Sequence, residues 1–235
     1  LSLSSTGALT VTGAHTFTSA DTTTLNCASI GSAAVTISST NLVTVTGAWT
    51  ASDSVSITST AKGITLNTDI TTTGSGKDLV LAAATGGTDG TITLQGTGAR
   101  TLTATGTATF TANRFVSAQI AAAITGDLTI TATTGWTATS GDLSLNSGGA
   151  MSLTSDLTTA TSGNMALQAT GAITVADGKT FTSVGTTTIQ SASVASGGAT
   201  VTSTGDLTLT LAGSGKWTAT SGNLALTTQA AFGLS

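Results

Sequence analysis

GDLTITATTGWTATSGDLSLNS, residues 126–147, holds the pattern that decides the fold. Leu and Ile alternate with Thr and Ser in LTIT (128–131) and LSLN (143–146), and this period of two is typical of a strand with one buried side. A Gly-Asp pair precedes each run, at 126–127 and 141–142, and such residues tolerate the backbone angles of tight corners. The stretch therefore predicts short strands joined by tight corners.

The same spacing continues along the chain. Large apolar residues recur about every six to nine residues, the length of one short strand and a turn. In the best-preserved part they are Leu128, Trp136, Leu143, Met151, Leu157, Met165, Ile173 and Phe181. Three such strands make a coil of roughly 20–25 residues, which lies within the range of solenoid repeats.

The sequence also contains a repeat that is longer than one coil. The three tryptophans, Trp49, Trp136 and Trp217, stand in similar phrases and are 87 and 81 residues apart. HTFTSADTTTLN (15–26), RTLTATGTATFT (100–111) and KTFTSVGTTTIQ (179–190) keep a similar step, and they place Phe17, Leu102 and Phe181 at equivalent positions. We therefore divide the chain into nearly three units of about 82 residues, roughly 1–78, 79–164 and 165–235, each of about four coils.

Composition supports an all-β structure. Threonine makes up about a quarter of the chain, whereas charged residues make up 7% and aromatic residues 3%, and proline is absent. Thr, Val and Ile favour strands, and a chain without proline can form uninterrupted interior strands. We expect a parallel β-solenoid of about 10–12 coils forming one repetitive domain over residues 1–235, as a segment of a longer array.

The phrases also resemble a known family. GDLTITATTG (126–135), GDLSLNSGGAMSL (141–153), GNMALQATGAITV (163–175) and GNLALTT (222–228) are similar to the repeats of filamentous haemagglutinin-type exoproteins and autotransporter passengers. The resemblance implies a right-handed parallel β-helix. It also implies a location outside the cell or on a bacterial surface, and a role in adhesion or in a stalk or fibre.

Other function classes find less support in the sequence. A net charge of −4 without a basic run argues against nucleic acid, and no apolar run is long enough for membrane insertion. His15 aligns with Arg100 and Lys179, which indicates an exposed position, and the single Cys27 is expected in the core. We expect no cofactor and no metal; GGTDGT (86–91) resembles a calcium turn but lacks the nonapeptide repeat.

A carbohydrate-cleaving enzyme would need convergent carboxylates. Asp142 aligns with Asn223, and Asn cannot act as a general acid, so we expect the aspartates to be corner residues that accept backbone hydrogen bonds. Asp142 and Asp206 are the residues that would test an enzyme. No catalytic residue is assigned.

Two binding functions remain as alternatives. Ice binding needs Thr-x-Thr at the same place in every coil, and we expect the Thr-rich segments, such as TLTATGTATFTAN (101–113), to be scattered over strand positions instead. Polysaccharide binding could use exposed indole rings, although packing in the core is the favoured role for tryptophan. The favoured function is a non-enzymatic structural or adhesive module of a surface fibre. Its partner is a further copy or continuation of the same array, with a surface glycan as an additional ligand.

Overall fold

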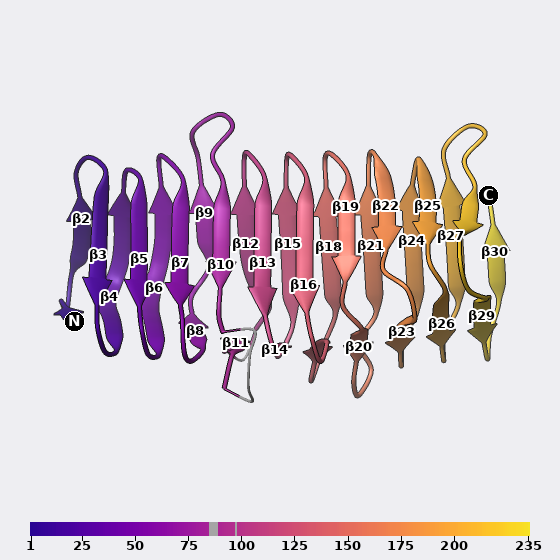
Figure 1. Cartoon of the computed structure of the whole chain (residues 1–235), viewed down its shortest axis with the longest axis horizontal. Coiled ribbons are helices and arrows are strands. Elements are labelled where there is room, and N and C mark those ends of the chain that lie inside the picture. The colour runs from indigo at the N-terminus through magenta and orange to yellow at the C-terminus, as the bar shows by residue number, and fades with distance from the viewer. Residues whose placement is uncertain (85–88, 97) are drawn as a thin grey trace.

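A computed structural model describes residues 1–84, 89–96 and 98–235 as a β-solenoid (Figure 1). About eleven turns stack along one axis, all strand pairs between them are parallel, and the described residues contain no helix. The termini lie at opposite ends of the stack (Figure 1). At about 4.8 Å a turn, the rod is roughly 50 Å long. The expected fold class and the three strands in each turn are confirmed.

Each of the first ten turns contributes a strand, or half of a longer strand, to each of three faces, and the last turn contributes to faces 1 and 2. Face 1 is formed by β1 (Ser2–Ser4), the first half of β4 (Thr23–Ser32), the first half of β6 (Val43–Ala51), β8 (Ile64–Asn67), β11 (Thr91–Leu94), β14 (Arg114–Ser117), β17 (Trp136–Ala138), β20 (Leu157–Thr159), β23 (Lys179–Ser183), β26 (Ala199–Ser203) and β29 (Leu224–Thr228). The long β4 and β6 run through a corner from face 1 into face 2.

Face 2 consists of β2 (Ala8–Val11), the second halves of β4 and β6, β9 (Ile70–Thr72), β12 (Arg100–Ala104), β15 (Ile120–Ile124), β18 (Leu143–Ser147), β21 (Met165–Ala169), β24 (Thr187–Ser191), β27 (Leu207–Leu211) and β30 (Phe232–Leu234). Face 3 is a separate ten-stranded sheet of β3 (His15–Ser19), β5 (Val35–Ser39), β7 (Val55–Ser59), β10 (Leu79–Ala82), β13 (Ala108–Ala112), β16 (Leu128–Ala132), β19 (Met151–Thr154), β22 (Ala172–Val175), β25 (Ser193–Ser196) and β28 (Trp217–Ala219).

Strand alternation builds the core. In β16, Leu128 and Ile130 are fully buried, while Thr129 and Thr131 between them face outward. Register partners stack inside as columns, such as Leu145, Leu167 and Ile189 on face 2, which follow one another at steps of 22 residues. A single turn has no interior of its own, so each turn is stabilised by the apolar side chains of the turns on either side.

The long repeat does not contain a whole number of turns. Trp49 lies in β6 on face 2, Trp136 in β17 on face 1 and Trp217 in β28 on face 3, so successive copies are eleven strands apart among the described residues. Eleven strands are three turns and two faces. A unit therefore spans three and two-thirds turns, close to the expected four coils, and each copy is rotated by one face relative to the copy before it.

Candidate functional site

The three tryptophans share one hydrogen bond. Each indole Nε1–H donates to a serine hydroxyl on the preceding turn: Trp49 to Ser32 at 2.9 Å, Trp136 to Ser117 at 3.1 Å and Trp217 to Ser196 at 3.0 Å. An alanine two residues after each tryptophan, at 51, 138 and 219, is the register partner of that serine. The small alanine leaves interior room in which the indole reaches back to the hydroxyl group.

Burial of the indole rings argues against a role as a sugar-binding platform. Trp49 and Trp136 are each 1% exposed, and the Trp136 ring stacks on Phe115 with centroids 4.8 Å apart. Trp217, in the tenth turn, is half-buried. The packing prediction is confirmed for Trp49 and Trp136, and an exposed aromatic platform at these two positions is excluded.

The other repeat markers are also interior residues on three different faces. Phe17 lies in β3 on face 3, Leu102 in β12 on face 2 and Phe181 in β23 on face 1. Leu102 and Phe181 are buried, and Phe17 in the first turn packs partly buried against the core. What the copies of these six markers share is therefore packing, and none of the six lies on the same face as its repeat equivalents.

Carboxylates and amides bridge successive turns at the corners. Oδ1 of Asp142 accepts the backbone N–H of Asn164 at 2.7 Å, and Oδ1 of Asn164 in turn accepts that of Thr186 at 2.8 Å. Asp206, one further turn along the same column, accepts the N–H of Ala231 at 3.1 Å. Asp142 and Asp206 thus stand three turns apart, each as a corner acceptor.

The repeat-equivalent aspartates make equivalent bonds. Asp69 accepts the N–H of Thr101 at 2.9 Å and Asp156 accepts that of Thr180 at 2.8 Å, each bond reaching the following turn. Because these bonds use the acceptor oxygens and not acidity, Asn can replace Asp at such corners.

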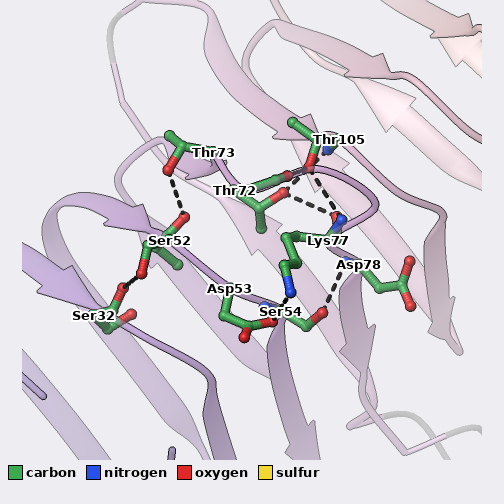
Figure 2. Close-up of polar contacts among 11 residues, drawn as sticks. Ser32, Ser52, Asp53, Ser54, Thr72, Thr73, Lys77, Asp78 and Thr105 are labelled. Carbon is green, nitrogen blue, oxygen red and sulfur yellow. Dashed lines mark hydrogen bonds and ion pairs between the residues drawn. The ribbon is translucent and has the colours of Figure 1, made fainter. Parts of the chain in front are cut away.

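The loop between β9 and β10 carries a denser polar network (Figure 2). Thr72 Oγ1 donates to the Lys77 carbonyl at 3.0 Å, and the Lys77 N–H donates to Thr105 Oγ1 at 3.1 Å. The Lys77 ammonium lies 3.0 Å from Asp53 of the preceding turn. The N–H of Ser54, followed by Lys77, holds the pKa of the Asp53 carboxyl group below its ordinary value of 3.8.

Threonines form an ordered array on the outside of face 3. Outward positions of β13, β16 and β19 align as Thr109, Thr129 and Ser152 in one column. The parallel column contains Thr111, Thr131 and Thr154, and Thr154 Oγ1 donates to Thr131 Oγ1 at 3.0 Å. Three earlier turns repeat the pairs as Thr16/Thr18, Thr36/Ser38 and Ser56/Thr58. Val80 and Ala82 of β10 interrupt the series.

Face 1 carries a single threonine column. From β4 to β29 it consists of Thr24, Thr44, Thr65, Thr93, Val116, Thr137, Thr158, Thr182, Thr202 and Thr227. The Thr-rich segments are spread over all three faces, as expected: TLTATGTATFTAN (101–113) places Thr101 and Thr103 in β12 on face 2 and Thr109 and Thr111 in β13 on face 3. The expectation did not include the register between turns, which aligns threonines from different segments in columns on face 1 and face 3.

Face 2 is hollowed beside a column of carboxamides. Asn146, Gln168 and Gln190 are consecutive register partners on β18, β21 and β24. They line a groove of about 340 Å³ together with Ala169, Thr170, Ser191, Ala192, Thr210 and Ala212. Sequence reasoning missed this column, although three amides at steps of 22 residues were a readable signal.

The remaining candidates are isolated. His15 is exposed at the start of β3, and Cys27 is a buried free thiol, as expected. The described residues contain no cluster of His, Cys, Asp or Glu that could hold a metal ion, and no helix among them could span a membrane. Residues 86–88 of the calcium-turn candidate lie outside the described residues, while Asp89 pairs with Lys62.

The first and last turns expose core columns along the axis. In the first turn Leu3, Leu9 and Phe17 are only partly buried, whereas their counterparts in middle turns are covered on both sides. In the last turn Phe232 is 49% and Leu234 69% exposed. Comparisons with protein-family models, with curated proteins and with solved structures give no match for this chain.

Proposed function

We propose that this chain is a non-enzymatic structural and adhesive module of an extracellular or bacterial cell-surface fibre. In this proposal it forms a right-handed β-helix of the filamentous haemagglutinin type, whose coils stack on further coils of the same kind. The observation that carries the proposal is the rotation of the repeat around the rod. A repeat that serves multivalent binding should return its side chains to one face, whereas here the copies share core packing on three faces.

The end turns support an axial partner. Apolar columns and backbone edges of a solenoid remain uncovered unless a cap or a further turn lies on them. Phe232 and Leu234 are large apolar residues in such a column. A further β-solenoid turn, from the same array or from a second copy, offers the matching columns and strand edges.

Electron microscopy across a concentration series tests the stacking. We expect rods that lengthen by whole modules as concentration rises, and we expect Phe232→Glu to stop this by placing a charge in the axial interface. Val184→Glu is the matched control, because Val184 is 39% exposed on the side of the rod. A compact monomer at all concentrations, or equal loss in both variants, contradicts stacking between copies.

A second candidate function is ice binding, which the threonine array on face 3 favours. Adjacent turns repeat at about 4.8 Å and alternate residues of a strand at roughly 6.7 Å, so the hydroxyl and methyl groups form a two-dimensional lattice. The buried Phe110, Ile130 and Leu153 beneath it pack the strands firmly. An uncharged lattice of this kind can hold water molecules in an ordered layer.

Thermal hysteresis and partitioning into growing ice test this candidate. Thr129→Tyr should abolish both activities, because the ring stands above the centre of the array while Tyr remains compatible with a strand. Thr158→Tyr, on the single column of face 1, should leave them unchanged. Ice binding is rejected if the unmodified protein is inactive, or if the two variants behave alike.

A further inference from the structure

The carboxamide column on face 2 has a geometry suited to a ligand. Asn146 and Gln190 are exposed and Gln168 is partly exposed, and all three point outward from the fourth of the five positions in their strands. The column ends at Ala123 on the preceding turn and at Thr210 on the following turn. Three consecutive turns therefore present an amide at the same register position of face 2.

One side of the groove beside these amides is formed by the corner that follows face 2. Thr170 and Ala192 stand at the corner where the chain leaves face 2, and Ala169 and Ser191 are buried next to them. The lining contains amides, hydroxyl groups and alanine methyl groups, and no charged side chain. A ligand for this groove is consequently polar and uncharged.

The hydrogen-bonding groups of the amides narrow the class of ligand further. A carboxamide offers two N–H donors and a carbonyl acceptor, so it can both donate to and accept from neighbouring hydroxyl groups. The amides repeat at about 4.8 Å along the axis. A polymer that presents hydroxyl pairs at a comparable repeat would meet one amide per unit, and an extended neutral glycan chain is such a polymer.

We infer that the groove along Asn146, Gln168 and Gln190 binds a neutral, extended glycan that runs parallel to the axis of the rod. The inference rests on the adhesive half of the proposed function and gives it a site and a ligand class. An acidic glycan would form no ion pair in this groove, because no cationic side chain lines it to pair with the carboxylates of the glycan.

Calorimetric titration tests the inference with three neutral probes, cellohexaose, mannohexaose and maltohexaose, and with an oligomer of galacturonic acid. At least one neutral probe should bind, and the acidic probe should not. Gln168→Leu keeps a similar shape but removes the hydrogen-bonding groups of the central amide, and it should weaken binding about tenfold, as expected for one or two lost hydrogen bonds.

Gln229→Leu is the matched control, because Gln229 is an exposed amide in the last turns and away from the groove. Its affinity should equal that of the unmodified protein. The inference is overturned if no neutral probe binds, if only the acidic probe binds, or if Gln168→Leu and Gln229→Leu have the same effect. Microscopy of rod assembly tests the stacking proposal independently of glycan binding, since stacking needs no glycan.

Discussion

At the scale of single residues, the tryptophan phrase is a packing unit. Its indole occupies the core, its N–H is satisfied by a serine on the preceding turn, and an alanine makes room for both. The sequence predicted that tryptophan packs inside, because its alternation with polar residues was readable. The serine partner was not predicted, since Ser32, Ser117 and Ser196 stand 17, 19 and 21 residues before their tryptophans and no fixed spacing marks them.

Ser117→Ala should destabilise the protein by about 1–3 kcal/mol, because the buried Trp136 N–H loses its acceptor. Ser196→Ala should cost less, since Trp217 is half-buried and water can replace the hydroxyl group. Denaturant unfolding of the two variants checks this order. Equal destabilisation would show that the bond matters independently of burial.

Acid should weaken the contact between Asp53 and the loop that follows β9. The pKa of Asp53 is depressed by the Ser54 N–H and by Lys77, so its contribution to stability is present above the ordinary value of 3.8. It is lost as the pH falls through the lower folded value. Thermal melting of the unmodified protein and of Asp53→Asn should therefore differ at neutral pH and converge as the pH falls through the lowered pKa of Asp53. A constant difference across this range would contradict the assignment.

At the scale of elements, the alternation of apolar and polar residues was enough to predict short strands and three strands in a turn. The phase of the repeat was not predictable in the same way. Corner lengths vary, and β4 and β6 pass through a corner without leaving strand geometry, so residue counts alone did not separate eleven strands from twelve. Pairing between turns decides the phase, and it also aligns the threonines and the amides.

Gly47 lies within one such corner, in β6. Its φ of 102° is unfavourable for other residues, and a Cβ there would collide with the Cys27 carbonyl oxygen of the preceding turn. Gly47→Ala should cost more than about 2 kcal/mol, because strain and collision add.

Gly13 is the matched control for the collision. Its φ is 80°, and a Cβ would meet nothing within 4 Å. Gly13→Ala should therefore cost only about 1 kcal/mol from backbone strain. Unfolding midpoints compare the two substitutions, and a Gly13 variant as unstable as the Gly47 variant would rule out close packing of turns as the reason for Gly47.

At the scale of the whole molecule, the chain is a rod with one continuous core and three chemically different sides. Face 3 carries paired threonine columns, face 1 a single threonine column, and face 2 the amide groove. Rotation of the eleven-strand repeat lets related sequences build all three sides while the interior stays the same. A structural role needs only the core and the ends, which leaves the sides free to diverge.

The central claim is that the tryptophan phrase at 126–147 builds the stacked core. Nuclear Overhauser contacts of the Trp136 indole test this most directly. We expect contacts with its register partners, Phe115 on the preceding turn and Leu157 on the following turn. An indole that shows contacts only to residues near it in the sequence, with the chemical shifts of a solvent-exposed ring, would contradict the stacking of turns and return the phrase to the surface.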